Sequence, residues 1–265
     1  MVSLRKNRTL KAFVLATIGF GAVGGALAGV LSDGSGDLLF LSLLVVAGTV
    51  SERFKINLFG DCHVSLSAFV AMAAGVVGGP RDAVIVAALL GLLANVGGAV
   101  PAYKTLFNIA VYVLSALSFV AVVSLLTTFD GLASGPYEIA ALTPAVMIDF
   151  ALNAMLVAVV VALASNTSAV AVVRTKYLWL APQYLPLGAL VFVASIGYQE
   201  IGAAIVLVLA VPVAALQLGS LLHANLRHSY DENISEVEER IIAVQLELAR
   251  VQSASKQRGA QEPAA

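Results

Sequence analysis

The stretch TLFNIAVYVLSALSFVAVVSLLT, residues 105–127, contains no charged side chain. A helix needs about 20 apolar residues to cross a bilayer, so this stretch predicts a transmembrane helix. The whole chain shares its character, with 60% hydrophobic and 12% charged residues, whereas an ordinary globular domain carries about 25% charged residues. We therefore predict an all-α fold, a polytopic bundle of membrane helices.

Outward from this helix, seven more apolar segments give about eight spans in all. Short breaker sequences separate several of them, including SDGSGD at 32–37 and GGPRD at 78–82. The second, third and seventh segments are short, so six spans with two re-entrant segments is the alternative. The eight segments are Ala12 to Leu31, Leu38 to Val50, Val64 to Val77, Ala83 to Ala99, Thr105 to Thr127, Ile139 to Ser165, Leu185 to Ile196 and Ile201 to Leu222.

The charged residues alternate between the loops as an even number of spans requires. Basic residues accumulate on the cytoplasmic side of short loops, which predicts both termini in the cytoplasm and a bacterial cytoplasmic (inner) membrane location. Arg81 is the one basic residue among the acidic loops. The basic set is Arg5, Lys6, Arg8, Lys11, Arg53, Lys55, Lys104, Arg174, Lys176 and Arg227, and the acidic set is Asp33, Asp37, Asp82, Asp130, Glu138 and Glu200.

Four regions follow from this pattern. Residues 1–11 form a basic cytoplasmic N-terminus, 12–222 the membrane helical domain, 223–254 a cytoplasmic exit helix with a coiled coil, and 255–265 a disordered tail. An independent domain takes roughly 100 residues or more, so we expect no catalytic domain beside the membrane region. A net charge of only -1 gives no reason to expect nucleic acid as a partner.

Polar residues inside the predicted spans are the candidates for a ligand-binding site. Asp149 is the most costly, because a carboxylate at a helix centre costs about 2.5 to 3.5 kcal/mol on insertion scales. Asn153 lies one turn further on the same face, and Asn108 and Tyr112 form a second stripe with the same spacing. The alternative is a packing role, in which Asp149 is protonated or bonded to a neighbouring helix.

Small residues on the first span predict close helix packing. Gly21, Gly25 and Gly29 recur every four residues, which lets a neighbouring backbone approach. The pattern leaves open whether the neighbour is in the same protomer or in a second copy.

The segment DENISEVEERIIAVQLELARVQ, residues 231–252, has the spacing of a short coiled coil. Its apolar positions alternate by three and four residues through about three heptads, which favours a homodimer. The alternative is an amphipathic helix that folds back on the membrane domain. The predicted core positions are Ile234, Val237, Ile241, Val244, Leu248 and Val251.

The sequence contains none of the common catalytic motifs for nucleotide binding, hydrolysis or redox chemistry. Its three histidines, His63, His223 and His228, share no metal-binding spacing with Cys62. We therefore expect no enzyme activity, no cofactor and no metal site.

Several stretches together resemble a known arrangement. They are SERFKINLFGDCHVSLSAFVAMAAGVVGGPRDAVIVAALLG (51–91), YKTLFNIAVYVLSA (103–116), LWLAPQYLPLG (178–188) and LLHANLRHSY (221–230). Together they are similar to the N-terminal multi-pass membrane region that precedes HD-GYP and GGDEF (cyclic-di-GMP) domains in bacterial signalling proteins. The resemblance implies a sensor that signals through its exit helix. Its characteristic positions are Phe107, Asn108, Tyr112, Ser115, Trp179, Pro182 and Gln183.

These observations predict a sensor-like membrane module that binds a small apolar or amphipathic ligand. Its expected partners are membrane lipid, the small-molecule ligand, a second copy through the coil, and a separate cytoplasmic output protein. The helices also resemble, more loosely, the substrate-binding membrane components of vitamin uptake transporters, which gives a small-molecule transport component as the alternative.

Overall fold

The computed structural model describes residues 8–53, 56–59, 62–64, 67–95, 100–127 and 136–211, and also Ile234, Arg240 and Ile241. Contacts divide the chain into two units, Met1–Gln217 and Leu218–Ala265. The first unit holds all the described elements. The coiled-coil positions Val237, Val244, Leu248 and Val251, and the predicted tail, lie outside the described residues.

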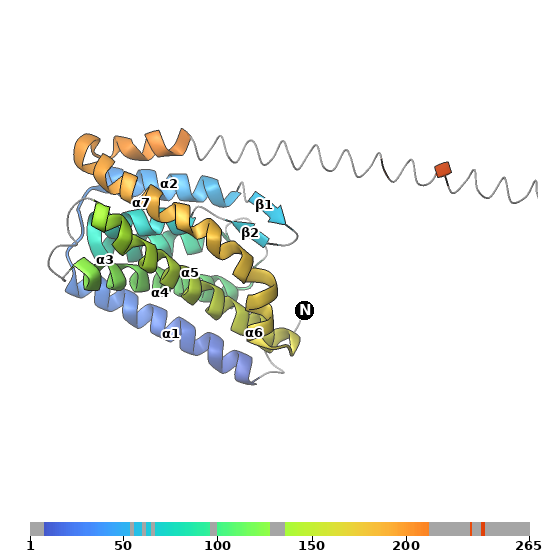
Figure 1. Cartoon of the computed structure of the whole chain (residues 1–265). Coiled ribbons are helices and arrows are strands. Elements are labelled where there is room, and N and C mark those ends of the chain that lie inside the picture. Colours follow the sequence, from blue (N-terminus) through green and yellow to red (C-terminus); the bar gives the residue numbers. More distant parts are fainter. Residues whose placement is uncertain are drawn as a thin grey trace, which may run out of the picture. The chain divides into compact units, whose positions relative to one another are not determined.

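The first unit is built almost entirely from helices (Figure 1). A short antiparallel hairpin of β1 (Ile56–Phe59) and β2 (Cys62–Val64) follows α2, in a place where we expected only a loop. A π-helical turn (Val173–Tyr177) and a 3-10 turn (Leu178–Leu180) join α6 to α7, and a further helix covers residues 204–211. The helices are α1 (Arg8–Leu31), α2 (Leu38–Arg53), α3 (Ser67–Leu93), α4 (Ala102–Thr127), α5 (Pro136–Ser165), α6 (Ala169–Val172) and α7 (Ala181–Ile201).

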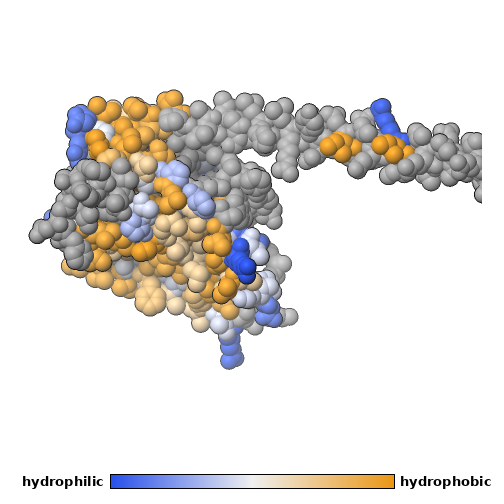
Figure 2. Space-filling view, viewed as in Figure 1, coloured by the Kyte–Doolittle hydropathy of each residue, from blue (hydrophilic) through white to orange (hydrophobic). Residues whose placement is uncertain are grey.

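The helices carry the apolar surface of a membrane protein. Five are long and apolar enough to cross a bilayer: α1, α3, α4, α5 from Leu142 and α7 from Tyr184. Large apolar side chains such as Phe20 and Val30 are 71% and 82% exposed, and most of the described face in Figure 2 is hydrophobic. Contiguous apolar surface on this scale suits lipid rather than water, so the chain is a multi-pass membrane protein.

Helix α3 folds back on itself, although its length alone would suggest one span. Gly79 has φ 80 and ψ -169, and Pro80 follows it. A Cβ added at Gly75 would lie 3.3 Å from the Cβ of Ala83, whereas eight residues of straight helix cover about 12 Å. The GGPRD breaker therefore makes a helical hairpin whose two arms, 67–78 and 80–93, are about 18 to 21 Å long. Each arm is shorter than the roughly 30 Å core of a bilayer.

Helix α4 lies at the centre of the bundle, where it contacts α1, α3 and α5. A Cβ added at Gly21 would lie 2.7 Å from the Cβ of Ala110, and one added at Gly91 would lie 2.8 Å from the Cα of Ile109. Gly25 also faces α4 and α3, through Val113 and Val84, whereas nothing lies within 4 Å of a Cβ at Gly29. Gly21 and Gly25 thus pack within the protomer, because no larger residue would let these backbones approach so closely.

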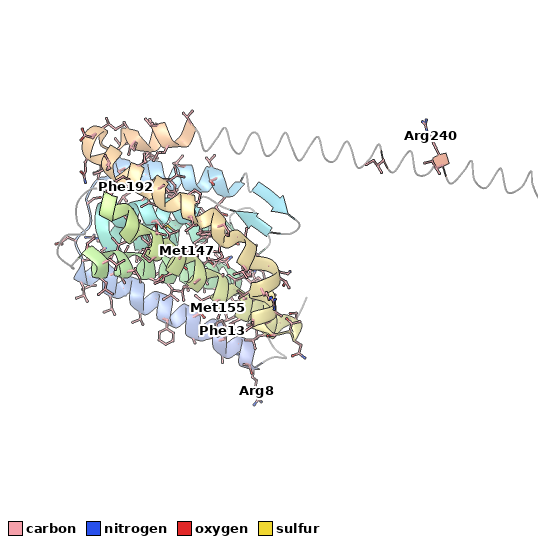
Figure 3. The ribbon with its side chains drawn as sticks, in the orientation of Figure 1. Arg8, Phe13, Met147, Met155, Phe192 and Arg240 are labelled. Carbon is pink, nitrogen blue, oxygen red and sulfur yellow. The ribbon has the colours of Figure 1, made fainter. Side chains whose placement is uncertain are left out.

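The bundle has ends of opposite charge. Leu10 of α1, Phe107 of α4 and Leu163 of α5 share one apolar cluster, so the basic residues beside them lie at one end, the basic end. The other end, the acidic end, joins the 32–37 loop, the α3 turn and the end of α7 through contacts of Asp82 and Asp37. Figure 3 shows Arg8 and Phe192 toward these two ends. The described basic residues there are Arg8, Lys11, Lys104, Arg174 and Lys176.

The glycine contact between α1 and α4 gives a direct test of the packing. Gly21→Val should lower the free energy of unfolding by about 1 to 3 kcal/mol, the usual cost of overpacking, because its methyl groups would meet the α4 backbone. Gly29→Val is the matched control, on the same helix in open space. Thermal unfolding in detergent measures both, and equal loss in the two variants would contradict this packing.

Candidate functional site

The described residues place three polar side chains together where α2 ends, α3 begins and α4 passes between them. The Tyr112 hydroxyl donates to Glu52 Oε1 at 3.2 Å, and the Ser67 hydroxyl donates to the Tyr112 oxygen at 3.4 Å. Glu52 is only 6% exposed and Ser67 only 1%. Tyr112 lies ten residues into α4, about 15 Å along the helix, so this polar cluster is inside the bundle.

Tyr184, near the start of α7, extends the cluster to α5. Its hydroxyl interacts electrostatically with the carboxyl groups of Asp149 and Glu52, and with Tyr112. Its ring packs on Phe150 with centroids 4.6 Å apart. The cluster therefore takes one side chain from each of five helices, and it includes two of the four residues predicted as ligand-binding, Tyr112 and Asp149.

Asp149 is the member of this cluster on α5. It is 3% exposed, and its Oδ2 atom has no hydrogen-bond partner among the described residues. The same holds for the hydroxyl of Ser115 on α4, which is also 3% exposed. Buried polar groups are normally hydrogen-bonded, so these two atoms are exceptions to that rule.

The other two predicted residues lie nearby but make no such connection. Asn108 and Asn153 are half-buried, each one turn toward the basic end from Tyr112 and Asp149 respectively. Neither amide has a hydrogen bond to another described residue. Asn95, just after the end of α3, donates to the Gly91 carbonyl at 3.0 Å, so its side-chain amide is already paired.

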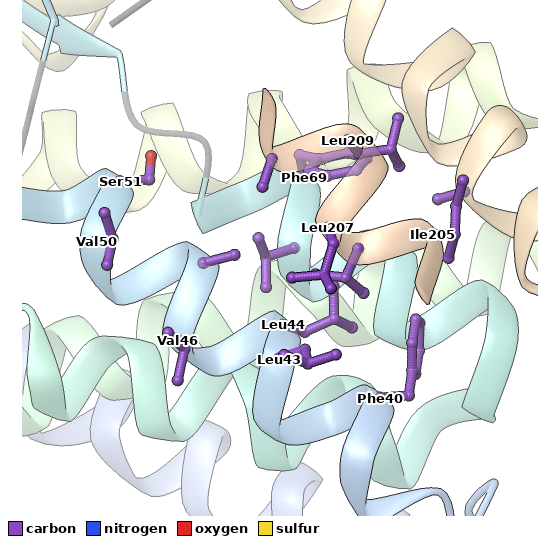
Figure 4. Close-up of a pocket in the computed structure, with 15 residues that line it drawn as sticks. Phe40, Leu43, Leu44, Val46, Val50, Ser51, Phe69, Ile205, Leu207 and Leu209 are labelled. Atoms are coloured by element: carbon purple, nitrogen blue, oxygen red, sulfur yellow. The ribbon is translucent and has the colours of Figure 1, made fainter. Parts of the chain in front are cut away.

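A second feature is a lateral cavity between α2, α3 and the 204–211 helix, with a volume of about 240 Å³. Its walls are apolar except for Ser51, which lies at one end of the α2 side (Figure 4). Sequence patterns gave no sign of it, because it forms between segments far apart in the chain. Residues that line it include Phe40, Leu44, Ala47, Phe69, Ile205 and Leu209.

A third feature is a cleft at the acidic end, with a volume of about 370 Å³. It lies between the α3 turn, the end of α4, and the acidic-end portions of α5 and α7. Serine, threonine and glutamine side chains contribute to its walls, so it is more polar than the lateral cavity. Its lining includes Pro80, Val120, Ser124, Leu142, Phe192 and Gln199.

Carboxylates organise the acidic end itself. Asp82 is 2% exposed and accepts hydrogen bonds from the backbone N–H and the hydroxyl of Ser35 at 2.8 and 2.6 Å. Asp37 accepts from the Phe40 N–H at the start of α2 and from the Tyr198 hydroxyl, both at 2.9 Å. The Phe40 N–H, followed by the Tyr198 hydroxyl, holds the pKa of the Asp37 carboxyl below its usual value.

Glu52, Ser67 and Tyr184 are the members of the cluster that sequence reasoning missed. Glu52 adjoins Arg53 in the run SERFK, which looks like an ordinary charged loop at the end of a span. Tyr184 follows Tyr177 and Trp179 near the basic residues Arg174 and Lys176, a pattern typical of the headgroup layer. Only the packing of α7 against α5 reveals that its ring lies on Phe150.

Metal binding has no support from the described residues, which contain no group of three His, Cys, Asp or Glu side chains placed to hold an ion. The side chains of Cys62 and His63 lie outside those that the structure describes, as do Trp179 and Gln183.

Comparison with known proteins found no match for this chain among protein-family models, curated proteins or solved structures.

The Asp37 contacts predict a pH dependence of stability. A carboxyl whose pKa is lowered on folding stabilises the fold above its unfolded pKa, about 3.9, and this contribution is lost as pH falls through the folded pKa. Tyr198→Phe removes one of the two donors, so it should modestly lower the unfolding temperature at pH 7, with a smaller difference near pH 3. Thermal scans at both pH values measure this, and a difference that does not narrow in acid would exclude the Asp37 contact as its cause.

Proposed function

We propose that this protein is a membrane-embedded, sensor-like module that binds a small apolar or amphipathic molecule in the lateral cavity. The observation that carries the proposal is the composition of the cavity wall. One side consists of α2 and α3, and the other is the 204–211 helix, the described start of the last apolar segment. A bound molecule would thus contact both the bundle and the helix that leads toward the C-terminal segment.

The cavity suits a small apolar guest. Ligand sites usually combine mostly apolar walls with a few polar groups, and here Ser51 is the polar side chain on the wall. A volume of about 240 Å³ is slightly below the roughly 300 Å³ at which typical ligand pockets begin. The occupant is therefore a small ring or one short aliphatic chain that enters from the lipid.

The 204–211 helix is placed to respond to such a guest. It follows Gly202, whose φ of 60 ends α7 in a sharp turn, and Ile205 packs directly on Gly197. A ligand shifts an equilibrium only as far as it prefers one of two states. Occupation of the cavity would favour the packing in which the 204–211 helix stands away from α2.

The output side of the proposal is a cytoplasmic coil. Ile234 and Ile241, one heptad apart, are helical and about half exposed, as seam residues would be in a single copy. The separation of basic and acidic ends supports cytoplasmic termini, whether the chain makes eight crossings or six with α3 as a re-entrant pair. The resemblance to cyclic-di-GMP sensor regions suggests a partner in that signalling class.

Photolabelling tests the lateral cavity directly. A short fatty acid that carries a diazirine should label Val46 and Leu207 in vesicles, and Ala47→Phe should reduce that labelling several-fold by filling the cavity. Phe20, which faces outward on α1, should be labelled equally in both proteins. Equal labelling of Leu207 in the wild type and in Ala47→Phe would contradict binding in the lateral cavity.

Crosslinking tests the relay. A cysteine at Val237, in a Cys62→Ala background, should form a dimer in membranes, and its yield should change when the photolabelling fatty acid is added. No dimer would favour the folded-back helix. If the yield of crosslinked dimer is the same with and without the fatty acid, and the same compound is transported into proteoliposomes, the transport alternative is favoured.

A further inference from the structure

Asp149 of α5 and Ser115 of α4 lie at about the same depth in the packed bundle. Two residue pairs indicate the antiparallel register of α4 and α5: Leu114 and Leu152 line the same groove, and Val123 and Leu142 line the acidic-end cleft. In this register Ser115 is level with residues 149–151. Two buried polar atoms without partners, Asp149 Oδ2 and Ser115 Oγ, therefore occur at one depth on facing helices.

Helix α7 supplies the third side of this location. Phe150 packs on Tyr184, and Val146 approaches Gly188, where an added Cβ would be 3.6 Å from Val146 Cγ2. This register places Asp149 between the levels of Tyr184 and Gly188. Phe150, which packs on Tyr184, is the neighbour of Asp149 in α5, so Tyr184 approaches this level from α7.

The acidic-end cleft lies above this group on the same three helices. Leu142 lines the cleft and is seven residues from Asp149, about 10 Å along α5. Val146 and Val191 lie between the two levels, and both are completely buried. These two valine side chains therefore lie between the cleft and Asp149.

A buried carboxyl with a hydroxyl group on each flanking helix favours a bound positive charge. An isolated carboxylate in apolar surroundings is very costly, and neutralisation removes that cost. The charged and titratable groups around it are Glu52 from α2, Tyr112 from α4 and Tyr184 from α7. One added positive charge is enough to neutralise Asp149.

We propose that Asp149, Ser115 and Tyr184 form an occluded site for a single positive charge, which enters from the acidic-end cleft. The guest is a proton, an alkali-metal ion or a primary ammonium group, all of which neutralise a carboxylate and interact with hydroxyl oxygens. This site is separate from the lateral cavity. In it, the predicted ligand-binding residue Asp149 binds a cation together with Ser115 and Tyr184, and the cation enters from the acidic end.

Carbodiimide labelling tests the site in vesicles. Dicyclohexylcarbodiimide reacts with a protonated carboxyl inside a membrane: the acid O–H adds across a C=N bond, and the adduct rearranges to a stable N-acylurea with no leaving group. Peptide mass spectrometry separates labelling at Asp149 from labelling at Glu52. We expect Asp149 to be labelled at low pH, and the label to decrease when the competing guest binds or the proton leaves.

The conditions identify the guest. A decrease with rising pH alone indicates a proton site, protection by NaCl at fixed pH indicates an alkali-metal ion, and protection by methylammonium but not NaCl indicates an ammonium group. Ser115→Ala should weaken cation protection about tenfold, because one charge-assisted contact is lost. Labelling of Asp149 that is the same at every pH and in every salt would overturn the proposal, since the carboxyl would then be a permanently protonated packing group.

Access is tested by widening the closed route. Val146→Ala should increase the rate of carbodiimide labelling at Asp149 several-fold. Ile148→Ala, at a side chain of the same helix that is 44% exposed, should leave that rate unchanged. Absence of label in both the wild type and Val146→Ala would also overturn the proposal. Ala47→Phe should not affect labelling, so this site and the lateral cavity can fail independently.

Discussion

The close approach of α4 to the backbones on either side of it is the contact on which the rest of the bundle depends. Ala110 and Ile109 are consecutive residues of α4, and they meet Gly21 of α1 and Gly91 of α3. Lipid supplies no hydrophobic drive for helices to associate, so membrane helices rely on van der Waals contact between small residues and on buried hydrogen bonds. This pair of contacts holds Tyr112 and Ser115, further along α4, inside the bundle.

Once α4 is fixed, the polar residues can only lie where other helices shield them from lipid. Glu52 and Ser67 reach Tyr112 because α2 ends and α3 begins at the same depth. The α3 hairpin makes that depth possible, since its arms extend from the acidic end only part of the way across the bundle. Asp82 secures the hairpin turn by accepting two hydrogen bonds from Ser35, so loop chemistry at one end determines where the interior cluster can form.

Much of the architecture could be predicted from the sequence, because apolar length and breaker residues are local signals. The presence of long apolar helices, the turn at Gly79 and Pro80, and the cost of Asp149 were visible in the chain itself, whereas several helix limits differ: α3 ends at Leu93 and not at Ala99, and α7 runs from Ala181 to Ile201. The partners of Asp149 were not visible, since they depend on the register of α5 against α4 and α7. Glu52 shows most clearly what the sequence does not reveal. Its neighbours Arg53 and Lys55 indicate the end of a membrane span, yet its own side chain is only 6% exposed.

The end of α2 connects the two candidate sites physically. Ser51 lines the lateral cavity and Glu52 accepts from Tyr112, and successive helical residues point about 100° apart. A rotation of this helix end therefore cannot move one side chain without the other. Tyr184 packs on Phe150, the neighbour of Asp149 in α5. Suppose that a ligand in the lateral cavity changes the affinity of Asp149 for its cation. The cation must then change the affinity of the cavity for that ligand by the same factor. Helix α2 is the element through which both effects would pass.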